Sequence, residues 1–165
     1  MILKTTNLEL RPWRESDAVE LYELAKNPNI GPIAGWPPHE SVEYSLKIIK
    51  TVFSKNETYA IIKDSKLIGS IAILIHPDGN YYWGDGCGEI GYWIGEEYWG
   101  HGFAFEASEI LLHHAFFDLK LERIYATYHV ENNQSRRVLE KLGFKYYDSV
   151  NNKGFLEIVM FSDGL

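Results

Sequence analysis

Residues 89–105 read EIGYWIGEEYWGHGFAF, and they lead from a strand, through a loop with three glycines, into a helix. The segment Glu89–Ile94 is short and rich in aromatic and β-branched residues, which is typical of a strand. Apolar residues at helical spacing predict a helix over Phe103–Leu119, and Arg123–Val130 returns to a strand. Because a strand, a helix and a strand in this order form a crossover connection, we expect the two strands to pair in parallel.

The segments on either side of this unit predict antiparallel strands and further helices. Two hairpins are expected because a short polar turn joins residues 58–63 to 67–75, and another joins 144–150 to 155–161. The other elements are expected as a strand at 8–12, an irregular Pro/Gly-rich loop at 28–38, and helices at 16–25, 40–54 and 133–142. The sequence therefore predicts an α/β fold of one domain, residues 1–165, with a mixed, mostly antiparallel sheet and about four flanking helices.

The composition excludes several classes of protein. Apolar residues make up 45% of the 165 residues, too many for a disordered chain. The single cysteine, Cys87, rules out an internal disulfide or a multi-thiolate metal site, and the six histidines show no ligand spacing, so no metal is expected. With 16 Lys and Arg against 23 Asp and Glu, the net charge of −7 argues against a nucleic-acid partner and fits a cationic ligand.

The chain shows no targeting or membrane signal. Its first residues lack the basic and apolar segments of a signal peptide, and no apolar run approaches the ~20 residues of a membrane span. We therefore expect a cytoplasmic protein that has no membrane partner.

Two glycine motifs differ in their context. Gly86–Gly91 matches the G-x-G-x-x-G pattern of dinucleotide sites, but it leads into a strand, whereas that fingerprint must open a helix. Gly100–Ala104 leaves a strand and opens a helix, where free amides and absent side chains suit a phosphate group. The same residues also fit a tight strand-to-helix turn that merely requires glycine.

Asn132–Ser135 lies between the next strand and the next helix. Asn132 or Asn133 is a good helix N-cap, and the same place, at the carboxyl end of a parallel strand, is where ligands collect in open sheets. Both roles are compatible.

Glu89 and three aromatic residues in loops are candidate residues of a functional site. A carboxylate in an otherwise uncharged strand can have a raised pKa and act as a base, unless it is an exposed edge residue. The aromatic side chains Trp36, Tyr82 and Trp83 lie in two loops, where they could line a substrate cleft or cover the core.

Taken together, four segments resemble the GNAT superfamily of acyl-CoA-dependent N-acetyltransferases. These segments are Leu8–Trp13, Glu89–Ile94, Tyr98–Ala107 and Asn132–Phe144, and they are most similar to those of the ribosomal-protein N-terminal alanine and serine acetyltransferases. The resemblance implies a sheet whose central parallel strands splay apart. It also implies transfer of acetyl from acetyl-CoA to a primary amine, which we expect to be a protein or peptide N-terminus, by direct attack within a ternary complex.

The resemblance also assigns roles to individual residues. It places coenzyme A on Tyr92, Trp93, Ile94, Tyr98, Gly100, His101, Gly102, Phe103, Ala104, Asn132 and Ser135. A strand amide would stabilise the oxyanion, a contribution often worth about 2.7–4 kcal/mol per donor. Glu89 would accept the ammonium proton, directly or through water, and Ser135 would assist the leaving thiolate.

Two positions depart from the family pattern. Glu97 stands where the phosphate loop often begins with Gln or Arg, so only the backbone contribution carries over. Leu139 stands where many members have a proton-donating tyrosine, which leaves Ser135 as the candidate.

Other functions fit the same residues. The acceptor could be a small amine such as an antibiotic or polyamine, or the chain could be an acyl-CoA-binding module without turnover. Either a monomer or a homodimer is compatible with the sequence, because aromatics such as Tyr146 and Tyr147 fit an interface or an ordinary surface.

Overall fold

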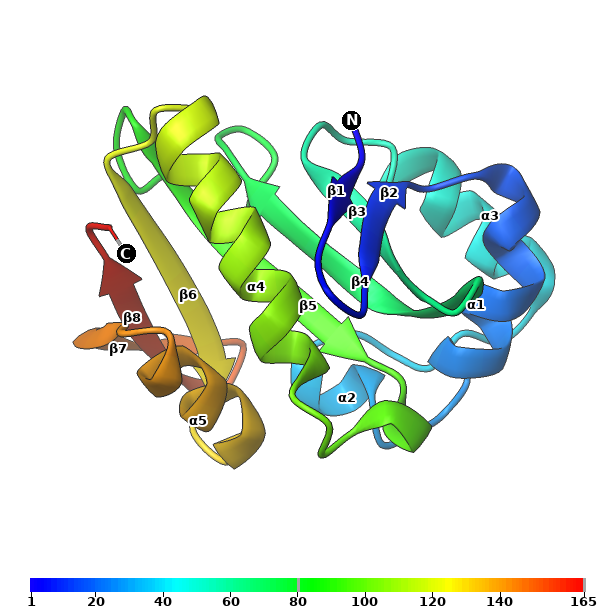
Figure 1. Cartoon of the computed structure of the whole chain (residues 1–165). Coiled ribbons are helices and arrows are strands. Elements are labelled where there is room, and N and C mark those ends of the chain that lie inside the picture. Colours follow the sequence, from blue (N-terminus) through cyan, green and yellow to red (C-terminus); the bar gives the residue numbers. More distant parts are fainter. Residues whose placement is uncertain (80, 165) are drawn as a thin grey trace.

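The computed structural model describes residues 1–79 and 81–164, and its eight strands form one sheet (Figure 1). The strands are β1 (Leu3–Lys4), β2 (Glu9–Pro12), β3 (Thr58–Lys63), β4 (Lys66–Leu74), β5 (Cys87–Ile94), β6 (Arg123–His129), β7 (Lys145–Asn152) and β8 (Phe155–Ser162). Their order in the sheet is β1-β2-β3-β4-β5-β6-β8-β7. Strands β5 and β6 pair in parallel and the other neighbours pair antiparallel, which confirms the predicted mixed sheet.

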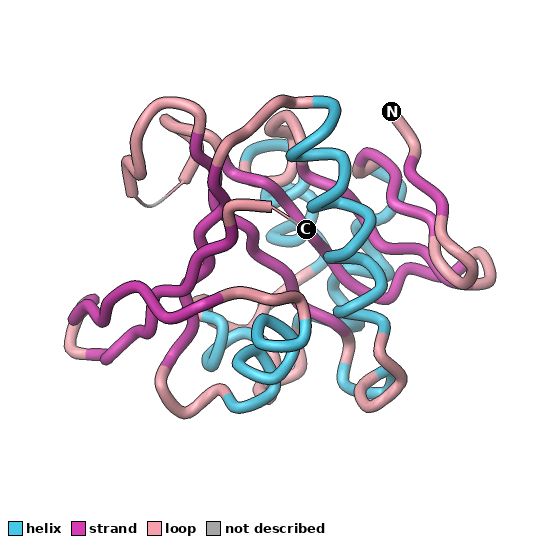
Figure 2. Tube along the Cα trace, turned by 60° about the vertical axis from the view of Figure 1, so that its left-hand side comes forward, coloured by secondary structure: helices cyan, strands magenta, loops and turns pink. Residues whose placement is uncertain are grey.

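Helices cover both faces of this sheet, as Figure 2 shows. The α-helices are α1 (Ala18–Ala25), α2 (Gly31–Ala34), α3 (Val42–Thr51), α4 (Phe103–His113) and α5 (Asn133–Lys141). Helices α4 and α5 pack on one face, and α1 and α3 pack on the other. Side chains of β3 point alternately to the two faces of the sheet. Ile61 belongs to the core under α4 and α5, while Ala60 and Ile62 belong to the core under α1 and α3. No helix in the described part of the chain is long and apolar enough to cross a bilayer.

The two parallel strands separate soon after they meet. Pairing between β5 and β6 runs over three positions, from Cys87 with Arg123 to Glu89 with Tyr125. Beyond Glu89, β5 stays paired with β4 and β6 stays paired with β8, so a gap opens between them. The Gly95 N–H donates to the Ile68 carbonyl (2.8 Å), and since backbone groups alternate along an antiparallel strand, those of Tyr92 point away from β4 and into the gap.

The loop predicted for residues 28–38 is wrong in part, because it contains α2. Pro32 lies within the first two positions of this helix, where its missing N–H costs nothing, and Gly35 (φ 94°) ends it in the left-handed conformation. A four-residue helix is too short to show a period, so the Pro and Gly residues that mark its ends have the composition of a loop. The two-residue strand β1, which pairs Leu3 with Leu10, was not expected for the same reason.

The predicted helix over Phe103–Leu119 is also corrected. Its α-helical part ends at His113, and residues His114–Asp118 form a π-helix. The His114 ring is 2% exposed and lies between two carboxylates, with Nδ1 2.7 Å from Asp118 and Nε2 2.9 Å from Glu57. Glu57 lies in the turn just before β3, 57 positions from His114, and no local pattern could have shown this contact.

Candidate active site

A cleft of about 570 Å³ lies where β5 and β6 separate, beside the first turns of α4 and α5. Every residue that the sequence assigns to coenzyme A lines this cleft except His101: Tyr92, Trp93, Ile94, Tyr98, Gly100, Gly102, Phe103, Ala104, Asn132 and Ser135. His101 lines an adjoining hollow of about 410 Å³, which also contacts Lys63 and Lys66 and shares Tyr98 and Phe103 with the cleft. The structure therefore brings the predicted cofactor residues together around one opening.

Sequence reasoning missed part of this lining. Asn29 and Ile30, the two residues before α2, line the cleft together with Ile33 and Ala34 of that helix, and α5 adds Arg137 and Val138. For α2, the available signal was the pair Pro32 and Gly35, which bracket a short helix but were interpreted as loop residues.

The N-terminus of α4 is open toward the cleft. Its N-cap is Gly102 (φ 77°), which provides no side-chain cap, and Gly100 also has a positive φ of 80°. The first intrahelical bond is donated by Glu106 to the Gly102 carbonyl (3.0 Å), so the amides of residues 103–105 have no acceptor among residues 1–79 and 81–164. A Cβ atom built on either glycine would meet open space. The turn needs glycine for its backbone angles, and it also leaves a positive helix end exposed to an anion.

The N-terminus of α5 is closed by its own side chain. The Asn132 side-chain oxygen accepts from the Ser135 N–H (3.2 Å), and the Asn132 carbonyl accepts from the Arg136 N–H (3.2 Å). Asn132 is therefore the predicted N-cap, and its capping oxygen lies at the wall of the cleft. The same cap fixes the backbone of Ser135, whose side chain lines the cleft with Tyr92.

Glu89 is a buried carboxylate and not an exposed edge residue, because only 5% of it is exposed. Burial raises the pKa of Glu89, and the nearby Glu157 carboxylate, itself 7% exposed, raises it further. The Trp83 indole N–H donates to Glu89 Oε1 (2.8 Å) and works in the opposite direction. Such a group holds its proton to a higher pH than an ordinary glutamate, so it can take up and return protons closer to neutrality.

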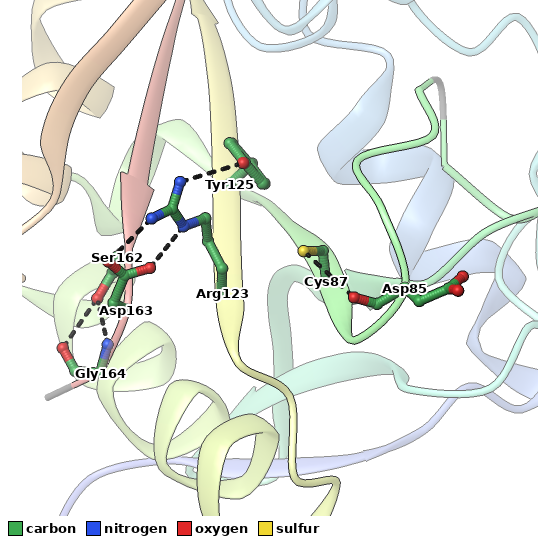
Figure 3. A network of polar contacts seen from close by, with 7 residues as sticks. All are labelled: Asp85, Cys87, Arg123, Tyr125, Ser162, Asp163 and Gly164. Atoms are coloured by element: carbon green, nitrogen blue, oxygen red, sulfur yellow. Dashed lines mark hydrogen bonds and ion pairs between the residues drawn. The ribbon is translucent and has the colours of Figure 1, made fainter.

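A chain of contacts holds the indole that orients Glu89. Trp83 stacks on Tyr125, with ring centroids 4.3 Å apart, and Tyr125 receives a weak hydrogen bond from Arg123 (3.4 Å). Figure 3 shows the Arg123 side chain held by Asp163: Nε donates to Oδ1 (2.5 Å) and Nη2 donates to Oδ2 (3.0 Å). The same view shows Cys87 at the start of β5, where burial raises the pKa of its thiol, which makes the group a weak nucleophile.

The three aromatic candidates for the acceptor side lie in different places. Trp83 covers Glu89, as described above. Trp36 does not line the cleft but packs against Trp93, which does, with ring centroids 5.6 Å apart. The Tyr82 ring is 60% exposed and its hydroxyl donates to Asp85 (2.7 Å). The structure therefore joins Trp83 to the candidate base, and a substrate-binding role for the three side chains stays a prediction.

The cleft offers two kinds of chemistry, and a third lies three residues before Tyr92 on β5, where Glu89 is buried but is not among the residues that line the cleft. Free amides at a helix N-terminus suit a phosphate, an unpaired strand edge suits an extended ligand with amide groups, and a buried carboxylate suits proton transfer.

Comparisons with known proteins identify the family. Residues 7–145 match the family model described as an acetyltransferase (GNAT) domain. The uncharacterized N-acetyltransferase YoaA of Bacillus subtilis (strain 168) is 30% identical over 170 residues, which cover 99% of this chain and 90% of YoaA.

Solved structures share the fold. A GNAT-family acetyltransferase from Bacillus anthracis superimposes with a TM-score of 0.83 at 23% identity, covering 98% of both chains. RimL, the ribosomal L7/L12 alpha-N-protein acetyltransferase, in complex with coenzyme A, superimposes with a TM-score of 0.85 at 21% identity, covering 99% of this chain and 98% of RimL. The chain therefore belongs to the GNAT family of N-acetyltransferases.

Proposed function

We propose that this enzyme transfers the acetyl group of acetyl-CoA to a primary amine, and that the amine is the N-terminus of a protein or peptide. The observation that carries the proposal is the open N-terminus of α4 beside the gap between β5 and β6. A helix end with free amides binds phosphate without a positive net charge, and this chain has a net charge of −7. The phosphates of coenzyme A therefore need such a local site.

The residues of the cleft fit coenzyme A. The amides of Gly100–Ala104 would hold its pyrophosphate, and the backbone groups of Tyr92, which face the gap, would pair with the pantetheine arm as an added strand. When bound, acetyl-CoA supplies an acetyl thioester to the amine. A free N–H in this part of β5 would donate to the thioester carbonyl and favour the charge that develops there.

Two side chains would handle protons. Glu89, directly or through a water molecule, would take the proton from the ammonium group so that the neutral nitrogen can attack. The Ser135 hydroxyl would donate a hydrogen bond to the leaving sulfur. Since Trp83 occupies Oε1 of Glu89, the other carboxylate oxygen is the one available for the proton.

The choice of acceptor rests on two supports. RimL, which shares the fold, is named as an acetyltransferase of the ribosomal L7/L12 N-terminus, and the sequence resembles that branch of the family. The buried carboxylates Glu89 and Glu157 favour a cationic acceptor, which an N-terminal ammonium group satisfies. A small cationic amine satisfies the charge equally well and is the competing substrate.

The substitution Glu89→Gln tests the catalytic part of the proposal. We expect the release of free CoA thiol, measured with a good acceptor, to fall about 100-fold, in line with the usual contribution of a general base. Glu109→Gln, on the exposed side of α4, is the matched control and should keep full turnover. Equal rates for Glu89→Gln and the wild type would remove Glu89 from the mechanism.

The pH dependence gives a second readout. The base must be ionised to accept a proton, and its pKa lies above the ordinary value of 4.5. Activity should therefore be present above the raised pKa and be lost as the pH falls through it. In Glu89→Gln this acidic limb of the kcat/KM profile should disappear.

A panel of acceptors tests the substrate. Peptides that begin with Ala or Ser should release CoA thiol faster than polyamines and aminoglycosides at equal concentration. The reverse order would replace the protein acceptor with a small amine. Calorimetric binding of acetyl-CoA without release of thiol for any amine would indicate a binding module.

A further inference from the structure

The Tyr92 hydroxyl is the buried polar group that the site leaves unexplained. It is fully buried and accepts or donates no hydrogen bond of good geometry within residues 1–79 and 81–164. Buried hydroxyl groups in native proteins are normally paired, because an unpaired one forfeits its bonds to water. An unpaired hydroxyl at the wall of a ligand cleft indicates a partner that comes with the ligand or that moves when the ligand binds.

Ser135 is the polar side chain beside it. Both residues line the cleft, Tyr92 from β5 and Ser135 from the first turn of α5. Burial raises the pKa of Tyr92 to about 12, and the Ser135 side chain lies near enough to oppose this shift. The phenol is therefore protonated at any physiological pH, and its O–H is available as a donor.

Apart from Tyr92, no hydrogen-bond partner among the described residues orients the Ser135 hydroxyl. Its backbone N–H donates to the Asn132 side-chain oxygen (3.2 Å), and among the described residues no hydrogen bond of good geometry is found for its side-chain oxygen. One turn further along α5 stands Leu139, which is 1% exposed and has no polar atom. Ser135 and Tyr92 thus both line the cleft, and each has a hydroxyl group without a hydrogen-bond partner of good geometry among residues 1–79 and 81–164.

We propose that Tyr92 is a positioning residue for the leaving-group step: its O–H donates to Ser135 Oγ and so directs the serine O–H toward the sulfur of coenzyme A. A serine hydroxyl has one hydrogen and two lone pairs, so occupation of a lone pair by Tyr92 restricts where that hydrogen points. The inference rests on the proposed function, in which Ser135 donates to the departing sulfur.

Three variants test it by turnover: Tyr92→Phe, Ser135→Ala and the double variant. Tyr92→Phe removes only the hydroxyl, and we expect kcat to fall roughly 10-fold while the Kd for acetyl-CoA stays within about twofold. If Tyr92 acts through Ser135, the double variant will be no slower than Ser135→Ala. Tyr128→Phe, another buried tyrosine of the same core on β6, is the control and should keep wild-type turnover.

A binding measurement tests the same contact without turnover. Desulfo-CoA lacks the sulfur, so calorimetry of CoA and desulfo-CoA isolates the hydrogen bond to it. The wild type should bind CoA several-fold more tightly than desulfo-CoA, and this preference should fall to near unity in both Tyr92→Phe and Ser135→Ala.

The outcomes separate the inference from the proposed function. Wild-type turnover in Tyr92→Phe, or effects of the two substitutions that multiply, would overturn the positioning role and leave the acetyltransferase proposal standing. A fall in kcat matched by an equal loss of acetyl-CoA affinity and a lower Tm would show a structural role and also overturn it. A wild-type protein that releases no CoA thiol with any amine would overturn both.

Discussion

Two helices begin at the same edge of the sheet, and their first turns are built differently. Helix α5 starts at a side-chain cap, with the Asn132 oxygen 3.2 Å from the Ser135 N–H. Helix α4 starts after Gly102, which has no side chain, and its first amides have no acceptor in the described residues 1–79 and 81–164. Both ends line one cleft, so the difference favours the α4 end as the one at which we propose that the phosphates bind.

The open end of α4 has a cost and a use. A side-chain cap typically stabilises a helix by about 1 kcal/mol, and α4 forgoes it. In exchange, the amides of Phe103 and Ala104 remain free, and the positive end of the helix dipole faces the cleft. Adding a cap to α4 and removing the cap of α5 are therefore the two direct tests of this difference between the helices.

The substitution Gly102→Asp should give the largest effect. Its carboxylate would cap α4 from within and repel phosphate, and Asp tolerates the positive φ of this position better than most residues. We expect the calorimetric Kd for acetyl-CoA to rise more than 100-fold.

Gly102→Asn is the matched control for charge. Asn has nearly the same shape and the same tolerance of positive φ, so it should weaken binding about 10-fold through occupancy of the amides alone. Unchanged affinity in Gly102→Asp would contradict the assignment of this helix end to a phosphate. A large fall in Tm for both variants would attribute the loss to the backbone.

Substitutions at Asn132 should have a smaller effect and separate its two roles. Asn132→Ala removes the cap, so the free energy of unfolding should fall by about 1 kcal/mol and the Kd for acetyl-CoA should rise about fivefold. Asn132→Ser restores a capping oxygen but not the amide, so stability should return while the affinity stays low. Denaturant unfolding and calorimetry on the same samples distinguish the roles. Full recovery of affinity in Asn132→Ser would make Asn132 a cap and nothing more.

The contrast between the two helices was partly visible in the sequence. Glycine at 100 and 102 against Asn at 132 predicted an open end and a capped end, because these residue types act through the local backbone. The parallel pairing of β5 and β6 followed in the same way from the order of the elements. The helix ends depend on local residue types and the strand pairing depends on the order of the elements, and both can be inferred from a single sequence.

Contacts between distant segments could not be predicted. The pKa of Glu89 is raised by burial and by the Glu157 carboxylate, 68 positions away, whereas the sequence alone allowed an exposed carboxylate. The orphaned Tyr92 hydroxyl depends likewise on where α5 places Ser135. Such contacts are set by packing across the sheet, and no pattern in the chain specifies them.

Positive side chains beside the N-terminus of α4 should make the smallest contribution to the affinity for CoA. The open end of α4 adjoins the hollow that contains Lys63 and Lys66, so cations stand near the proposed phosphate site in an acidic protein. Both side chains are at the surface, and Lys63 is already paired with Asp64 (2.7 Å), so each should contribute little.

We expect the double substitution of both lysines by Met to raise the Kd for CoA about threefold at low salt. Because salt screens exposed charges, the difference from the wild type should vanish near 0.5 M NaCl. Lys47→Met, on the exposed side of α3, makes a similar change of charge far from the hollow and should leave the Kd unchanged. An effect of equal size in that control would mean that the two lysines make no local contribution and that the amides of α4 bind the phosphates without them. A loss of affinity that persists in high salt would contradict a contribution from exposed charge and would show that the lysines act through contacts that salt does not screen.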